Sequence, residues 1–254
     1  MLKINEDYPM LFTSLKSRLD SPNSVDLIWL ALGSVAMAEF AAHARPGAVV
    51  LDLQHGLWDR ASMESAIAVI GKQVPVIARC AANGAHEIAQ ALDAGAASIL
   101  VPLVETADDA RRAVEYARYP PLGKRSAGGV RPLLHGMETM IESGLQVAVG
   151  VLIETVTGIE NADAIAAVPG IDYLFIGTGD LSLSRGTADP HTIGRDCDRV
   201  RAAARAHGLP CGIYTRDAEA TREAFAQGYR MAVAANDIDL IKQGFRVAHD
   251  AALK

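Results

Sequence analysis

The stretch Val149-Gly150-Val151-Leu152-Ile153-Glu154 is a short apolar run that stops at a carboxylate. A second run, at residues 173–176, is followed by a Gly-Thr-Gly turn and stops at Asp180. Short, β-rich apolar runs bounded by glycine or polar residues are typical of strands that are buried on both faces. A carboxylate at the carboxyl end of such a strand faces the place where parallel sheets bind their ligands.

Six further runs resemble these two, which makes eight predicted strands. Alanine- and charge-rich segments with apolar residues three and four apart separate the strands, for example at 61–70, 86–92 and 107–116. This alternation predicts an α/β fold with parallel strands, and eight units favour closure into a (β/α)₈ TIM barrel. An open doubly wound sheet is the alternative, but no G-x-G-x-x-G follows the first strand. The predicted strands are residues 27–32, 49–53, 74–78, 98–104, 146–153, 173–176, 211–214 and 231–235.

The composition suits one barrel and argues against several classes of partner. The chain has 254 residues, close to the roughly 250 of a TIM barrel, and no linker divides it, so we expect one domain at 1–254. A net charge of −6 without basic clusters argues against nucleic acid and anionic membranes as partners. The first residues lack the basic start and long apolar core of a signal peptide, so we expect none, and no apolar run is long enough to span a membrane. Three cysteines without metal-type spacing suggest reduced thiols in a cytoplasmic protein.

One connection, residues 118–144, is long and rich in proline and glycine. Long irregular connections in compact domains are usually functional, and we expect this one on the mouth side, between the fourth and fifth strands. Its cations Arg118, Lys124 and Arg125 either recognise an anionic substrate or are solvated loop charges. After Asp237 the apolar spacing predicts a final helix.

Glu154 and Asp180 are the strongest candidates for a functional pair. Because they end neighbouring strands, they are expected at the same rim, where two carboxylates suit one hard divalent cation. The alternative is that both cap helix amino termini. No lysine ends a strand at this rim, which argues against a Schiff-base mechanism.

Three other residues have weaker cases. Arg79 ends the third strand and has the planar fork that grips a carboxylate, although it is equally compatible with a structural ion pair. His55, just after the second strand, is a candidate general base or a rim histidine with a structural hydrogen bond. Trp29 in the first strand lines the pocket or packs in the core.

Five phrases together resemble the HpcH/HpaI aldolase family, whose members are class II, metal-dependent 2-oxo acid aldolases. These include the 4-hydroxy-2-oxoheptanedioate and 2-dehydro-3-deoxyglucarate aldolases. The resemblance extends over about residues 29–237. The phrases are LDLQHG at 51–56, VPLVET at 101–106, RYPPLGKRS at 118–126, VLIET at 151–155 and FIGTGDLSLS at 175–184.

The resemblance implies roles for individual residues. Glu154 and Asp180 fall on the metal ligands, Arg79 on the arginine that grips pyruvate, and His55 on the catalytic histidine. Asp93, which by spacing alone is a surface helix residue, falls on the aspartate that pairs with this histidine. We also expect substrate contacts from Trp29, Gly179 and Ser126. The family fold is a barrel whose last helix is exchanged between subunits, commonly in a hexamer built as a trimer of dimers.

We therefore expect a lyase that cleaves or forms a 4-hydroxy-2-oxo acid, with pyruvate and an aldehyde as partners and Mg²⁺, Mn²⁺ or Co²⁺ as cofactor. The chain departs from the family at Gln54, at Leu152 and in the missing proline of the turn before Asp180. These departures keep two alternatives open. One is citrate-synthase-like or citramalyl-CoA lyase-like chemistry on the same site, and the other is a non-catalytic, metal-dependent oxo-acid binding protein.

Overall fold

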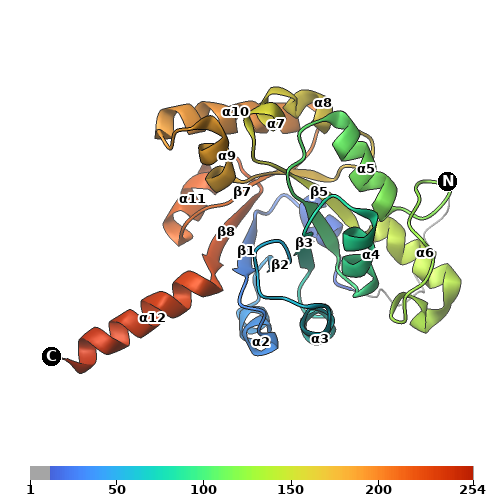
Figure 1. Ribbon diagram of the computed structural model, residues 1–254, viewed down its shortest axis with the longest axis horizontal. Coiled ribbons are helices and arrows are strands. Elements are labelled where there is room, and N and C mark those ends of the chain that lie inside the picture. Colours follow the sequence, from blue (N-terminus) through green and yellow to red (C-terminus); the bar gives the residue numbers. More distant parts are fainter. Residues whose placement is uncertain (1–11, 254) are drawn as a thin grey trace.

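The computed structural model describes residues 12–253, in which eight parallel strands pair in sequence order and close into a barrel (Figure 1). The predicted α/β TIM barrel is thus confirmed. Each strand pairs with the next along the chain, and β8 pairs with β1. The strands are β1 Val25–Leu30, β2 Ala48–Asp52, β3 Val76–Arg79, β4 Ser98–Val101, β5 Ala148–Ile153, β6 Tyr173–Ile176, β7 Cys211–Ile213 and β8 Met231–Asn236.

The observed strand ends differ from the predicted ones for local reasons. β4 ends at Val101, three residues early, because Leu103 has a left-handed backbone with φ of 53°. β5 begins two residues late because the preceding helix continues through Gln146.

Helices follow the strands and cover the outside of the barrel (Figure 1). Several begin at a side-chain cap: Asp59 and Thr106 each form a capping box, and Asp217 accepts the backbone N–H of Ala220. The helices are α1 Leu15–Asp20, α2 Val35–His43, α3 Arg60–Ile70, α4 Ala85–Asp93, α5 Ala107–Ala117, η1 Pro132–His135, α6 Gly136–Gln146, α7 Val156–Glu160, α8 Ala162–Ala166, α9 Thr178–Arg185, α10 Pro190–Ala206, α11 Ala218–Ala226 and α12 Asp237–Ala252.

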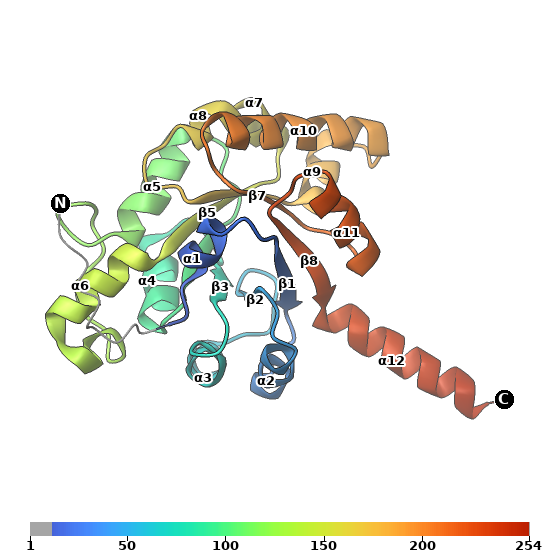
Figure 2. The same cartoon turned by 180° about the vertical axis from the view of Figure 1, so that it is seen from behind.

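Two apolar layers hold the barrel together. The larger lies between the strands and the surrounding helices, and the smaller fills the barrel interior with side chains such as Leu27, Ile77 and Phe175. Helix α1 adds Leu15 and Leu19 to the interior layer, and Figure 2 shows it lying across one end of the barrel. The strands are therefore buried on both faces, as their continuous apolar runs predict.

The connection at 118–135 lies opposite the mouth, and the expectation that it lies on the mouth side is wrong. It follows α5, and a helix in a βα unit returns the chain to the amino-terminal end of the next strand. Arg118 accordingly pairs with Asp172, which precedes β6, at 3.4 Å. Lys124 pairs with Glu115 at 2.6 Å, so these two loop cations have partners away from the mouth.

Helix α12 extends away from the barrel in both views (Figures 1 and 2). Every residue from 242 to 253 is exposed, including Phe245 and Val247, whose exposed fractions are 74% and 59%. No helix within residues 12–253 is long and apolar enough to cross a membrane. The predicted domain boundaries, 1–254, include residues 1–11 and 254, which lie outside the described residues.

Replacing Gly150 by alanine should lower the free energy of unfolding by about 1–3 kcal/mol through overpacking. A Cβ at this position in β5 would meet the Tyr173 ring at 2.1 Å, and that ring is fully buried, with its hydroxyl 3.0 Å from Ser98 Oγ. Urea unfolding followed by circular dichroism measures the effect. The matched control is Gly194→Ala in α10, where a Cβ meets nothing within 4 Å and the exchange should be neutral or stabilising. Equal stability of G150A and wild type would contradict the packing argument.

Candidate active site

A cavity of about 230 Å³ opens among the carboxyl ends of the strands, where a TIM barrel binds its substrates. Its charged side chains come from β2, β3, the end of β5 and the turn after β6. Its lining residues are Trp29, Ala31, Asp52, Arg79, Leu152, Glu154, Phe175, Gly177, Thr178, Gly179, Asp180, Tyr214, Asn236 and Ile238.

Glu154 follows β5 directly and is 1% exposed. One carboxylate oxygen, Oε1, accepts the backbone N–H of Leu103 at 2.9 Å. The other oxygen, Oε2, lies where a Cβ on Gly177 would come within 2.6 Å, so a glycine is needed at that position. The carboxylate is therefore fixed in place by one backbone donor and by close packing against the turn after β6.

Asp180 lies in the first turn of α9, and its charge acts directly on Glu154. Burial, together with the nearby Asp180 carboxylate, raises the pKa of Glu154 to about 7, against the opposing hydrogen bond from Leu103. The Asp180 carboxylate disfavours the charge on Glu154, and two carboxylates so close together form a donor set that suits a hard divalent cation. Within residues 12–253, no group of three or more His, Cys, Asp or Glu side chains is arranged to hold a metal. The site therefore fits a cation only if water or substrate oxygens complete its coordination.

Arg79 is gripped by Asp52, which ends the neighbouring strand β2. Arg79 Nε donates to Asp52 Oδ1 at 2.8 Å, and Nη2 donates to Oδ2. Burial favours the protonated carboxyl, but the hydrogen bonds and charge of Arg79 outweigh it and lower the pKa of Asp52. The pair is buried, so it holds the guanidinium in one orientation beside the cavity.

Aromatic rings form one wall of the cavity. Trp29 donates its indole N–H to Asp52 at 3.1 Å, and the Arg79 guanidinium lies 5.1 Å from the centre of its ring. Tyr214 packs edge-on against Trp29 with ring centres 5.2 Å apart. Trp29 therefore both lines the cavity and packs in the core, so the two hypotheses for this residue are compatible.

His55 lies in the turn after β2 and does not line the cavity. Its backbone N–H donates to Asp52 Oδ1 at 3.1 Å, which ties the turn to the Arg79 pair, while the residue itself is exposed.

The structure does not bring Asp93 to His55 within one chain. Asp93 is the last residue of α4, and this helix runs from the mouth to the opposite end of the barrel. There its carboxylate pairs with Arg125 Nη2 at 2.7 Å. Ser126 is exposed next to Arg125 in the same connection, so it lies away from the cavity. Gly179, by contrast, lines the cavity as expected.

Several lining residues were missed by the sequence analysis. Asp52 ends a buried strand just as Glu154 follows one, and the same rule applied to β2 would have found it. Tyr214 and Asn236 also lie at strand ends, but neither is charged, and no local pattern separates them from ordinary rim residues.

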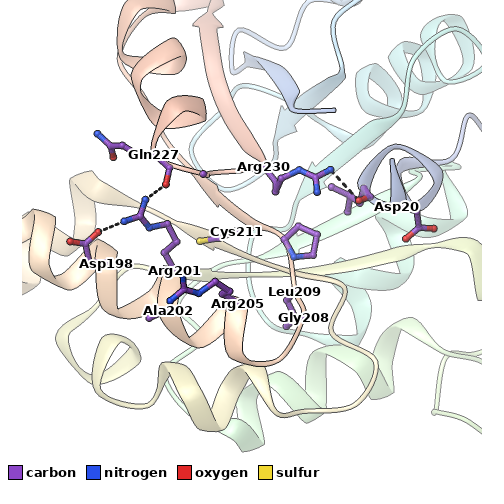
Figure 3. A pocket seen from close by; sticks show the side chains of 13 residues that line it. Asp20, Asp198, Arg201, Ala202, Arg205, Gly208, Leu209, Cys211, Gln227 and Arg230 are labelled. Carbon is purple, nitrogen blue, oxygen red and sulfur yellow. Dashed lines mark hydrogen bonds and ion pairs between the residues drawn. The ribbon is translucent and has the colours of Figure 1, made fainter. Parts of the chain in front are cut away.

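A larger cavity, of about 720 Å³, lies at the opposite end of the barrel, and two of its arginines, Arg201 and Arg230, have structural partners (Figure 3). Arg201 binds Asp198 at 2.7 Å and the carbonyl of Gln227 just after α11. Arg230 donates to three backbone carbonyls at the end of α1 and in the turn that follows. Cations are favourable at helix carboxyl ends, so these groups stabilise the end of the barrel opposite the reaction site.

The chain is similar to known proteins in both sequence and fold. A family model described as HpcH/HpaI aldolase/citrate lyase matches residues 26–243. A 4-hydroxy-2-oxovalerate aldolase from Rhodococcus jostii is 40% identical over 192 residues, which cover 71% of this chain and 74% of the relative. A hydroxypyruvate/pyruvate aldolase from Paraburkholderia phytofirmans is 32% identical over 237 residues, with 88% and 91% covered. The crystal structure of an HpcH/HpaI aldolase/citrate lyase family protein from Burkholderia cenocepacia superposes with a TM-score of 0.88 at 33% identity, covering 94% and 99%.

The protein without bound metal should lose stability as the pH rises from about 4.5 to 7. The pKa of Glu154 is higher in the folded protein, about 7, than its ordinary value of 4.5, so the folded state holds a proton that the unfolded state releases. The loss should be on the order of 3 kcal/mol, measured by urea unfolding in EDTA at pH 5 and pH 8.

Glu154→Gln is the matched control for this pH dependence. The variant should not lose stability over the same range, and at pH 8 added Mn²⁺ should stabilise the wild type but not the variant. A wild-type stability that stays constant or rises between pH 5 and 8 would contradict the assignment of a raised pKa to Glu154.

Proposed function

The chain belongs to the HpcH/HpaI aldolase/citrate lyase family and is an aldolase acting on 2-oxo acids, and we propose that it interconverts a 4-hydroxy-2-oxo acid with pyruvate and an aldehyde. Because the chain belongs to an aldolase family, the alternative of a non-catalytic binding protein is excluded. The observation that carries the proposal is the buried Glu154 facing Asp180 beside the fixed guanidinium of Arg79.

Glu154 and Asp180 would hold the metal of this metal-dependent family. Their oxygens are hard ligands, and their mutual repulsion disappears when a cation lies between them. Mg²⁺, Mn²⁺ and Co²⁺ all accept such ligands. When bound, the cation supplies Lewis-acid stabilisation for negative charge on the oxygens of the 2-oxo acid.

Arg79 would bind the carboxylate of the 2-oxo acid. Asp52 occupies its Nε and Nη2, so the guanidinium has a fixed direction before the substrate enters. A preorganised charge of this kind needs no reorientation as negative charge develops on the 2-oxo oxygen. The apolar wall of Trp29 and Phe175 keeps water from one side of the cavity and strengthens the interaction.

His55 would remove the proton from the 4-hydroxyl of the substrate. The C3–C4 bond then breaks, the aldehyde leaves, and C3 of pyruvate takes up a proton. Because the imidazole is exposed at the rim and does not line the cavity, we propose that the proton travels through a water molecule. The pairing of His55 with Asp93 stays a prediction, and the described chain does not realise it.

Assembly into a hexamer with exchanged carboxyl-terminal helices is part of the proposal. Support comes from α12, which extends from the barrel with Leu240, Phe245 and Val247 exposed. Light scattering of the purified protein would measure the mass of the assembly. A cytoplasmic location is proposed as well, and it is supported by the three cysteines, which are buried and unpaired.

Glu154→Gln and Asp180→Asn should each lower the metal-dependent exchange of the pyruvate methyl protons with D₂O by more than 100-fold, because each removes one charged ligand of the cation. Proton NMR of pyruvate measures this exchange without any aldehyde. Asp196→Asn is a control, since this carboxylate binds Arg185 at 2.7 Å away from the cavity. Exchange at the wild-type rate in either variant would refute the ligand assignment.

His55→Ala should slow cleavage of the 4-hydroxy-2-oxo acid by about 10²–10⁴-fold, the usual contribution of a general base. The affinity for Mn²⁺, measured by calorimetry, should not change, because His55 touches neither carboxylate. An unchanged cleavage rate would remove His55 from the mechanism. Turnover of oxaloacetate with acetyl-CoA, in place of pyruvate with an aldehyde, would favour the citrate-synthase-like alternative.

A further inference from the structure

Among residues 12–253, the cavity lining offers no positive group for a second anion. Its lining carries the carboxylates of Asp52, Glu154 and Asp180, whereas Arg79 is the only cationic side chain on the part of the lining that the structure describes. A divalent cation and Arg79 together balance these three carboxylates. The carboxylate of pyruvate then adds a negative charge, so a second anionic group would enter without a partner and would lose its hydration.

The remaining polar side chains of the lining are neutral: Thr178 lies in the turn after β6, and Tyr214 and Asn236 lie at the ends of β7 and β8. Tyr214 is half-buried, and its hydroxyl is hydrogen-bonded to Asn236 and lies near the charges of Asp239, Arg79 and Asp52. Its ring is held edge-on against Trp29 at 5.2 Å. The backbone carbonyl of Tyr214 accepts a hydrogen bond from Thr178 Oγ1 at 3.4 Å. The packing of the ring and the hydrogen bond to the backbone carbonyl together fix the position of the Tyr214 hydroxyl.

Asn236 keeps hydrogen-bonding capacity for a ligand. Its Nδ2 donates to Asp239 Oδ2 at 2.8 Å, and its Oδ1 accepts the backbone N–H of Asp239 at 2.9 Å. A primary amide has two N–H donors and two acceptor lone pairs. Asn236 also forms a hydrogen bond with the Tyr214 hydroxyl, so one acceptor lone pair of Oδ1 remains for a ligand. These contacts also lock the amide in one orientation. Ile238 completes this end of the cavity with an apolar surface.

We propose that the second substrate is a short, uncharged hydroxyaldehyde whose hydroxyl group is bound by Tyr214 and Asn236. This inference rests on the proposed aldolase function. The cavity has a volume of about 230 Å³, so only a small aldehyde fits beside pyruvate. A hydroxyl can donate to one of the two side chains and accept from the other, whereas a carboxylate would meet only neutral groups and the charges of the acids.

The reaction with such an aldehyde balances without a further reactant. In the condensing direction, C3 of pyruvate loses a proton and forms a bond to the aldehyde carbon. The aldehyde oxygen takes up a proton and becomes the 4-hydroxyl of the product. The distal hydroxyl of the aldehyde takes no part in the chemistry, so its binding affects selectivity alone.

The first experiment compares glycolaldehyde with acetaldehyde, which lacks the hydroxyl, in wild type and Tyr214→Phe. Initial rates of condensation with pyruvate are measured by NMR. The variant should lower the ratio of kcat/KM for glycolaldehyde to kcat/KM for acetaldehyde about five- to tenfold. Tyr116→Phe on α5, away from the cavity, is the matched control. An equal effect of Tyr214→Phe on both aldehydes would overturn the role of the hydroxyl.

The second experiment tests the charge argument with succinic semialdehyde and pentanal, an uncharged aldehyde of similar length. The wild type should favour pentanal at least tenfold in kcat/KM. Ile238→Lys should reduce this preference at least fivefold relative to Ile238→Met, which has similar length and no charge. A wild-type preference for succinic semialdehyde, or equal ratios in the two variants, would overturn the proposal.

Pyruvate methyl exchange without aldehyde separates this inference from the proposed function. If exchange is present and the charged aldehyde is preferred, the selectivity inference fails and the aldolase assignment stands. If exchange is absent in the wild type with Mg²⁺, Mn²⁺ and Co²⁺, the proposed function itself fails.

Discussion

Burying a carboxylate next to a second carboxylate is the costly arrangement on which this site depends. Glu154 has almost no contact with solvent, one backbone donor, and a neighbouring negative charge from Asp180. Such a group is expensive to keep ionised, and a divalent cation relieves both its desolvation and its repulsion. The barrel tolerates it because β5, β6 and the left-handed backbone at Leu103 hold it in place.

The Asp52 carboxylate organises the other half of the site. It receives the guanidinium of Arg79, the indole N–H of Trp29 and the backbone N–H groups of the turn that contains His55. Side chains from β1 and β3 and two backbone groups of the turn after β2 are thus tied to one buried acid. Removing that acid would leave the buried guanidinium without its counter-charge. The pair therefore stabilises the fold and also orients Arg79.

The two ends of the barrel divide stability from chemistry. At the end of the barrel opposite the mouth, Arg201 and Arg230 bind carbonyls at helix carboxyl ends, and Asp93 forms an ion pair with Arg125. At the mouth lie the groups that a ligand can bind: two neighbouring acids, an amide oxygen with one free lone pair, and a tyrosine hydroxyl. This division explains why the larger cavity of the two is not the one suited to the reaction.

The barrel, its eight strands, and the position of Glu154, Asp180 and Arg79 at the mouth can all be predicted from the order of residues along the chain. This is possible because buried parallel strands require continuous apolar runs, and the residue after such a run must lie at the rim. The partners of these side chains became known only from the folded chain: Asp52 for Arg79, Tyr214 beside Asn236, and Arg125 for Asp93. Those contacts join residues far apart in the chain. The position of Asp93 and of the connection at 118–135 depends on the direction in which the preceding helix runs along the barrel. The spacing of apolar residues predicts the helix, but it does not predict which side chains meet at its end.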